Sequence, residues 1–400
     1  MVTCDGTPFA LRRERLVAWA ARFSGTLGDA MNAPPCQAPE GAILHLGRQL
    51  RLDDNPLLAS AAASRPRLLP VFALDPAVRR GAHQEAFLVA ALADLQASLR
   101  QRGSDLLLLA EPPPAAVREV YDSPRRMIDE ADLPFDPPAM PRTYTPFRQK
   151  VEAGGVRFSP PIAAPERLPP LPDGVTCPTI VVPDLPLIAA GGESAGREHW
   201  QRYRDRRLPD SYKRTRNELL GWDLSSKLSP WLAWGCLSPR RLADDLARYE
   251  AEHGANEGTY WLWFELLWRD FFSLRGDHRA SDAWSVDPAD PRWLMLAGAR
   301  LGHPLVDAGF RELNATGFLG NRMRQIAASF CCHELGWPWE IGAAYFAHQL
   351  IDHDPASNVG NWRYIAGQGA DPRGGRRFDI EKQREMYDPA GAYVRFWGAR

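Results

Sequence analysis

The chain has 400 residues, a formal net charge of −1 at pH 7 and a hydrophobic content of 45%. Its length predicts two or three domains with enough residues to bury a core. The near-zero charge excludes a general polyanion binder but is compatible with a local basic face. The ordinary apolar content predicts a soluble globular protein, and no run is long enough to span a membrane.

Two residue types narrow the class of protein further. The six cysteines show no CxxC or zinc-like spacing, so we expect free thiols, no metal site and a reducing, cytoplasmic location. Fourteen tryptophans are unusual. Because a buried indole N–H needs a partner, they favour a flat aromatic ligand or electron transfer, with a large helical core as the alternative.

Residues 1–40 show no signal-peptide pattern and predict a loose N-terminal extension, whereas residues 41–121 have the pattern of an α/β domain. The strands are expected at 43–46, 67–74 and 105–110, and the helices from Asn55, at 84–100 and at 114–121. Because strands alternate with helices, we expect a parallel sheet.

The rest of the chain divides into a connector and a helical domain. Residues 122–190 are rich in proline, which predicts an ordered connector that cannot hold long helices. From residue 191 to residue 400, amphipathic patterns follow one another with short breaks, so we expect an all-helical domain.

The first stretch with chemical potential in the helical domain is residues 225–231. Three serines and Lys227 stand just before the start of an apolar helix. Hydroxyls and free backbone N–H groups at a helix N-terminus can hold a pyrophosphate. A serine-rich helix cap is the alternative.

A second stretch, residues 259–272, has helical spacing that collects aromatic residues around a carboxylate. One face carries Trp261, Glu265, Trp268 and Phe272. Glu265 is expected either to pair with Arg269, one turn further on, or to face a ligand.

Two more polar stretches follow. Asn321, Arg324, Gln325 and Ala328 share one helix face, which is either solvated surface or the wall of a pocket. Residues 352–364 combine acids, amides and aromatics. Pro355 and Gly360 predict a turn there, offering either a site for a flat polar ligand beside Trp362 or a capped interhelical loop.

Together these stretches resemble the cryptochrome/photolyase family. Residues 47–56 resemble the family's opening signature, and the later stretches follow in the family's order over about residues 42–397. The segments most similar to DASH cryptochromes, the single-stranded-DNA photolyases, are 227–233, 265–270, 321–325, 371–383 and 387–389. The resemblance implies a shortened Rossmann-like N-terminal domain and an all-α FAD-binding domain.

The resemblance also implies which residues surround the FAD. Arg324 and Asp352 would pair near the isoalloxazine ring, and Asn358 would face flavin N5. The full set expected to hold the cofactor is Tyr212, Ser225, Ser226, Lys227, Leu228, Ser229, Glu265, Arg269, Asn321, Arg324, Asp352, His353, Asp354 and Asn358.

The activity implied by the resemblance is blue-light repair of cyclobutane pyrimidine dimers, in which reduced flavin gives an electron to a lesion flipped out of DNA. Glu265 would hydrogen-bond the lesion and Trp268 would stack on it. A chain of tryptophans would carry electrons to the flavin. Its expected members are Trp362, Trp339 and a distal residue, for which Trp284 is the better match and Trp293 the other.

A basic excess lies near the expected cavity mouth and would contact DNA phosphates, with a solvated loop as the alternative. The expected DNA-binding residues are Arg322, Gln325, Arg363, Arg373, Arg376, Arg377 and Lys382.

The chain departs from the family pattern after Tyr121, where a strand–helix–strand segment is missing. We therefore expect three strands instead of five, with the first strand at an edge and apolar surface exposed. In the family the missing segment carries the carboxylate that holds a folate antenna (methenyltetrahydrofolate), so that antenna is not predicted here.

Three functions stay open at this point. The first is a light-driven lyase for dimers in single-stranded or looped DNA, which the retained Glu265 and Trp268 favour. The second is a blue-light photoreceptor that signals without repair, and the third is a decayed copy. The shortened N-terminal domain favours the second or the third. We expect a monomer.

Overall fold

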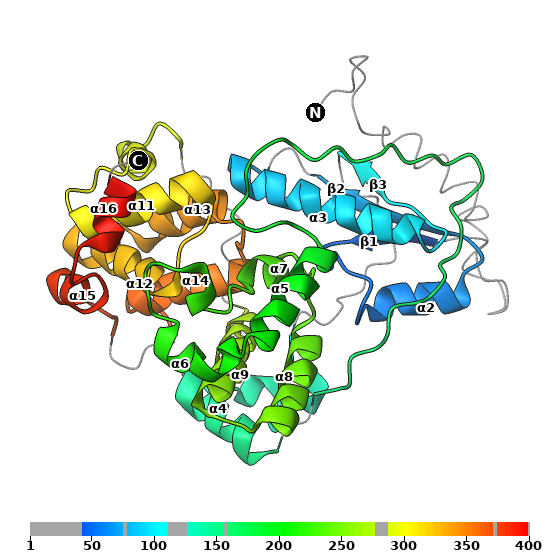
Figure 1. The fold of residues 1–400 in the computed structure, drawn as a ribbon, viewed down its shortest axis with the longest axis horizontal. Coiled ribbons are helices and arrows are strands. Elements are labelled where there is room, and N and C mark those ends of the chain that lie inside the picture. The colour runs from blue at the N-terminus through cyan, green and yellow to red at the C-terminus, as the bar shows by residue number, and fades with distance from the viewer. Residues whose placement is uncertain are drawn as a thin grey trace.

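The structure is a computed structural model that describes residues 42–74, 78–110, 126–155, 158–276, 287–370 and 374–398. A small α/β unit is followed by a larger helical unit, and Figure 1 shows the two packed side by side. The expected fold class is therefore confirmed. The extension 1–40, the helix at 114–121, Trp284 and Arg373 lie outside the described residues.

The α/β unit contains a parallel sheet in the order β1-β2-β3. The strands are β1 (Ala42–Leu46), β2 (Leu68–Ala73) and β3 (Leu107–Leu109), and the helices are α2 (Pro56–Ser64) and α3 (Ala82–Arg100). Asn55 begins α2 as expected, because its side chain accepts a hydrogen bond from Leu58 N at 3.2 Å. Three strands are thus present in the described residues, with β1 at an edge.

The expectation that this edge exposes apolar surface is wrong. Ile43, Leu44 and Leu46 of β1 are at most 5% exposed. One face of the sheet packs against Leu171 and Val175 of the connector, and the other face shares a core with α3. Figure 1 shows the connector as a long coil around the α/β unit, so a segment without strands covers the sheet.

The connector also contains a short helix that the sequence analysis did not predict. α4 (Tyr144–Ala153) is ten residues long. The prolines lie on either side of this segment, and Pro146 sits in its first turn, where a missing N–H breaks no helical hydrogen bond.

The helical unit begins at residue 193 and consists mainly of α-helices. They are α5 (Glu193–Asp205), α6 (Tyr212–Thr215), α7 (Ser229–Ala233), α8 (Pro239–His253), α9 (Glu257–Arg275), α10 (Pro291–Ala297), α11 (Pro304–Thr316), α12 (Asn321–Ser329), α13 (Trp339–Gln349), α14 (Pro355–Ile365), α15 (Ile380–Tyr387) and α16 (Ala392–Gly398). A capping box of Asn256 and Thr259 starts the long helix α9, and Gly276 in the left-handed region ends it.

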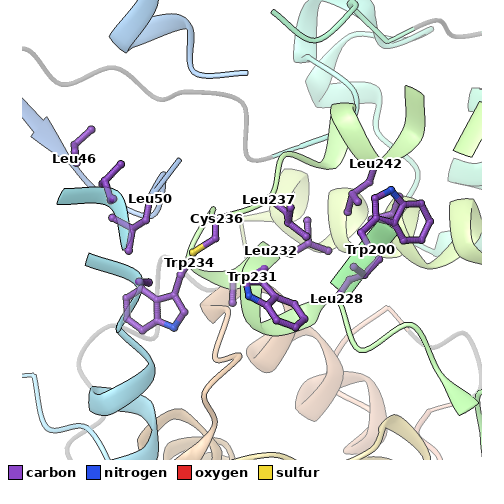
Figure 2. Packing of buried hydrophobic residues seen from close by; sticks show 14 of the residues in the cluster. Leu46, Leu50, Trp200, Leu228, Trp231, Leu232, Trp234, Cys236, Leu237 and Leu242 are labelled. Atoms are coloured by element: carbon purple, nitrogen blue, oxygen red, sulfur yellow. The ribbon is translucent and has the colours of Figure 1, made fainter. Parts of the chain in front are cut away.

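A single apolar core crosses the boundary between the two units. Figure 2 shows Leu46 and Leu50 of the α/β unit in one cluster with Trp231, Trp234 and Leu237 of the helical unit. All five side chains are less than 5% exposed, so their burial depends on contact between the units.

A loop of residues 47–55, which we call the docking loop, fastens this boundary with buried charges. Arg51 is 1% exposed and donates to the carbonyls of Asp53, Asp54 and Gly235 at 2.9, 2.8 and 3.0 Å. Asp54 is fully buried and pairs with Arg240 of α8 at 2.6 Å.

The backbone of the docking loop is held equally closely. Glu193 of α5 accepts hydrogen bonds from Leu52 N at 2.6 Å and Asp53 N at 3.1 Å. Gly235 has φ +68°, and a Cβ there would lie 2.1 Å from the carbonyl oxygen of Arg48. Only glycine satisfies both the conformation and the contact.

We predict that Arg240→Leu strongly destabilises the protein, because it leaves the Asp54 carboxylate buried and unpaired. Such a loss lowers the free energy of unfolding by roughly 3–5 kcal/mol, measurable by urea denaturation followed by circular dichroism. The control is Arg202→Leu, because Arg202 and its partner Glu198 are 62% and 70% exposed and such a pair is worth about 1 kcal/mol or less. Equal effects of the two substitutions would contradict the assigned role of the docking loop.

Candidate functional site

A cavity of about 840 Å³ opens in the helical unit, a size typical of ligand sites. Its wall brings together residues from α4, α9, α12, α14 and the loop before α7. The sequence-predicted residues that line it are Tyr212, Ser225, Ser226, Lys227, Leu228, Ser229, Glu265, Trp268, Arg269, Asn321, Arg324, Gln325, Asp352, His353, Asp354, Asn358, Trp362 and Arg376. Four separate stretches of the sequence thus meet in one place.

The serine-rich loop lies in this wall without capping a helix. α7 starts at Ser229, and no side chain makes a cap hydrogen bond, so the helix-cap alternative is wrong. Lys227 has φ +50°, and its ammonium lies 5.2 Å from the ring of Phe318. Burial lowers the pKa of Lys227, and a bound anion would oppose that shift.

Of the two alternatives for Glu265, the pairing with Arg269 is wrong, and Glu265 lines the cavity. It forms an ion pair with Arg216, which also lies 4.3 Å over the ring of Trp261. Arg269 instead donates to Leu232 O at 3.2 Å. Burial raises the pKa of Glu265 and the Arg216 guanidinium opposes the rise. Sequence spacing missed this pair because its partners are 49 residues apart.

Trp268 stacks on a residue that the sequence analysis did not consider. The ring of Tyr144 on α4 lies parallel to the indole, with ring centroids 3.7 Å apart and an interplanar angle of 12°. Tyr144 was missed because the proline-rich connector was predicted to be irregular. The helical spacing of Tyr144, Phe147 and Val151, the buried residues of α4, is the signal that could have found it.

The predicted turn at 352–364 is only partly correct. The chain turns before Asp354, but α14 begins at Pro355. Asp354 caps the helix by accepting from Ser357 N at 2.8 Å, and proline suits a first helical position. Close packing explains the glycine inside this helix, because a Cβ at Gly360 would lie 2.1 Å from Phe272 Cδ1.

Buried polar atoms at the start of this segment lack partners. Arg324 pairs with Oδ2 of Asp352 at 2.7 Å, but Oδ1 of Asp352 and Nδ1 of His353 are buried with no hydrogen bond. Burial lowers the pKa of His353 to about 3, so this imidazole is neutral. Such orphaned atoms are costly and fit a polar ligand that supplies their hydrogen bonds.

One carboxylate and one amide in the cavity wall are already oriented by hydrogen bonds within the protein. Burial raises the pKa of Asp354, but the Arg269 guanidinium and the Ser357 N–H outweigh it and hold that pKa well below its usual range. The amide of Asn358 donates to Ala343 O at 2.9 Å. This bond fixes the amide plane in the cavity wall.

The predicted tryptophans lie in different parts of the helical unit. Trp362 lines the cavity and is 2% exposed, whereas Trp339 starts α13 and donates to Gln368 Oε1 at 3.0 Å. Trp293 packs against Tyr345 and His348, with ring centroids 4.8 and 5.4 Å apart. These partners lie roughly 9–14 Å along α13 from Trp339.

Most of the predicted basic residues that the structure describes have partners for their charges, and one of them, Arg376, lines the cavity. Arg376 lies 4.8 Å over the ring of Tyr364 in the cavity wall, and Arg322 lies 4.8 Å over Tyr387. The other contacts are Arg363 with Gln368 O at 3.0 Å, Arg377 with Glu334 at 3.0 Å and Lys382 with Asp379 at 3.7 Å.

A buried acid stands behind the cavity. Glu312 on α11 is 9% exposed and accepts a hydrogen bond from the hydroxyl of Tyr393 on α16. Burial raises its pKa to about 7, although Tyr393 and Lys227 act in the opposite direction.

Comparison with known proteins gives matches over most of the chain. A family model described as the FAD binding domain of DNA photolyase matches residues 261–399, and one described as DNA photolyase matches residues 42–124. The chain is 38% identical to a cryptochrome DASH of Vibrio parahaemolyticus, covering 88% of this chain and 92% of that protein. It is 40% identical to a cryptochrome DASH of Natronomonas pharaonis, covering 89% of each.

Solved structures give the same relationship. A cryptochrome from Synechocystis superposes with a TM-score of 0.80 at 34% identity, covering 90% of this chain and 89% of that chain. A class III photolyase from Agrobacterium tumefaciens superposes with a TM-score of 0.76 at 25% identity, covering 91% and 88%.

We predict that Gly342→Ala lowers the FAD content of the purified protein. A Cβ at Gly342 would lie 2.0 Å from Cη2 of Trp362, so the substitution displaces an aromatic wall of the cavity and costs roughly 1–3 kcal/mol. The ratio of flavin to protein absorbance measures the effect. Gly47→Ala is the control, because nothing lies within 4 Å of its added Cβ and Gly47 does not line the cavity. Wild-type FAD content in Gly342→Ala would refute the prediction.

We also predict a pH dependence that Glu312 controls. Its folded pKa of about 7 lies above its ordinary value of 4.5, so the stability gained from protonation is present below pH 4.5 and is lost as pH rises through 7. Between these two pH values the free energy of unfolding of the wild type should therefore fall relative to that of Glu312→Gln. The expected fall is ~1.4 kcal/mol for each unit by which the pKa is shifted. Urea denaturation at pH 5 and pH 8 measures this difference, and a pH-independent difference would contradict it.

Proposed function

The chain belongs to the cryptochrome and photolyase family, and from that premise we propose that it is a light-driven photolyase that repairs cyclobutane pyrimidine dimers in single-stranded DNA. It carries the FAD-binding domain of that family and is similar to DASH cryptochromes over most of its length, so its cofactor is FAD. One observation carries the proposal. The same cavity joins Glu265 and Trp268 to every residue expected around the cofactor.

The cavity residues fit FAD on their own chemistry. We assign the pyrophosphate to the hydroxyls and backbone of Ser225–Ser229, beside the buried cation of Lys227. The unpartnered Oδ1 of Asp352 and Nδ1 of His353 would meet polar atoms of the cofactor. Asn358 supplies a neutral amide beside the flavin. FAD, when bound, supplies light absorption and one-electron transfer to the lesion.

We assign lesion binding to the α9 face of the cavity. The carboxylate of Glu265, held by Arg216, presents acceptor oxygens to pyrimidine N–H groups, and Trp268 presents a ring face to a flipped-out base. For the return of the flavin to its reduced form, we assign electron donation to Trp362 in the cavity wall and then to Trp339. The helices that carry them, α13 and α14, pack against each other.

We assign contacts with DNA phosphates to the predicted DNA-binding residues, which are Arg322, Gln325, Arg363, Arg373, Arg376, Arg377 and Lys382. Arg377 and Lys382 are 67% and 76% exposed, so a phosphate can replace their carboxylate partners. Binding should therefore weaken with salt despite the net charge of −1. The proposal contains no folate antenna, because the segment that holds it in the family is missing from this sequence.

We propose a cytoplasmic location and a monomeric oligomeric state. Cys177, Cys236, Cys331 and Cys332 are free thiols, and burial raises the pKa of Cys177 to about 12. In the part of the chain that the structure describes, no helix has the length and hydropathy needed to cross a bilayer.

A repair assay tests the proposed function. The FAD-loaded, reduced protein is mixed with single-stranded or duplex oligonucleotides that carry one thymine dimer, exposed to blue light, and restored thymines are measured by chromatography. We predict light-dependent repair that is faster in the single strand. Repair of duplex at the same rate would contradict the strand preference, and flavin photoreduction without repair would instead support a photoreceptor.

We predict that Glu265→Gln slows this repair by roughly tenfold or more, the value of a hydrogen bond to a charged group. The control is Glu381→Gln on α15, because that carboxylate is 61% exposed and its ion-pair partners among the described residues, His303 and Arg384, do not line the cavity. Equal rates for wild type and Glu265→Gln would remove Glu265 from the proposed site.

A further inference from the structure

One part of the cavity wall comes from a segment that neither family model covers. The models match residues 42–124 and 261–399, whereas Thr143–Pro146, at the start of α4, lines the cavity from between them. The connector therefore contributes directly to the site as well as covering the sheet.

Tyr144 is the residue of this segment with the most specific contacts. It is 4% exposed, its ring stacks on Trp268, and its hydroxyl donates to Phe264 O at 2.8 Å. In a regular helix this same carbonyl accepts the Trp268 N–H. Tyr144 is thus fixed to the turn of α9 from which Trp268 projects.

The stack constrains how Trp268 can be used. Phe271 and Tyr364 meet the indole edge-on, with ring centroids 5.6 and 5.9 Å away, and Phe272 of the same helix lies at a tilt of 34° with its centroid 5.2 Å away. Since Tyr144 covers one face of the ring, a base can stack only on the opposite face. Trp268 is then a rigid platform with one usable side, for one base of a dimer.

We propose that Tyr144 is a positioning residue that holds the Trp268 indole as a one-sided platform for a flipped-out pyrimidine. The inference rests on the proposed function and adds a specificity element from the connector. A base on Trp268 would complete a stack of three rings, with the lesion at the cavity end and Tyr144 at the protein end. The second pyrimidine of the dimer must find its contacts on other walls.

Three substitutions separate stacking from folding. Tyr144→Phe keeps the ring and removes only the hydroxyl, and Phe264 O keeps its helical partner. Tyr144→Leu removes the stack. Phe147→Leu is the structural control, because Phe147 is fully buried and holds α4 to α9 through Phe271, with ring centroids 5.2 Å apart.

The experiment measures the affinity of the FAD-loaded protein, in the dark, for a labelled single strand with one thymine dimer and for the undamaged strand, by fluorescence anisotropy. We expect Tyr144→Leu to raise the Kd for the dimer strand roughly three- to tenfold, the range of an aromatic pair. FAD content and the repair rate of the saturated complex are measured for every variant, and Tyr144→Leu should change the affinity for the dimer strand more than either of them. Tyr144→Phe should bind as wild type does.

Each other result overturns the inference. If Tyr144→Leu binds as wild type does, or if Phe147→Leu weakens binding equally, Tyr144 has only a structural role. If Tyr144→Phe weakens binding as much as Tyr144→Leu, the hydroxyl and not the stack is responsible. If wild type does not prefer the dimer strand, the proposed function fails and the inference fails with it, and the wild-type titration alone identifies that case.

Discussion

The buried ion pair between Asp54 and Arg240 is the constraint on which the rest of the structure depends. With Arg51 it fixes the docking loop between the sheet and the helices, at the point where neither unit alone could bury these charges. The same loop reaches the cavity, because Arg48 donates to His353 O and lies 4.7 Å over the ring of Trp234. The small α/β unit therefore supports the cavity floor even though it lies outside the FAD-binding unit.

In the cavity wall, arginine–carboxylate pairs also connect separate segments of the helical unit. Arg324 of α12 holds Asp352 ahead of α14, and Arg216 beyond α6 holds Glu265 of α9. Each pair joins segments that are distant in sequence. Both members of each pair line the cavity. The charges are thus arranged before any ligand enters, which reduces the cost of ordering them on binding.

Local patterns predicted those parts of the site that depend on one helix at a time. The 3.6-residue period was enough to group Glu265 with Trp268, and Asn321 with Arg324. It could not identify Arg216 or Tyr144, because their partners come from other elements. Pro355 was interpreted as part of a turn although it begins a helix, since proline breaks helices in the interior but suits their first turn. The buried β1 edge was missed because its cover, the connector, has no periodic pattern.

The most direct test of this account is the absorption spectrum of the purified protein before and after blue light with a thiol reductant. The account predicts flavin bands that bleach to the reduced form, because the proposed function puts FAD in the cavity and assigns electron delivery to Trp362 and Trp339. A folded protein that takes up no added FAD would contradict the central claim that the four stretches of the helical unit form a flavin site.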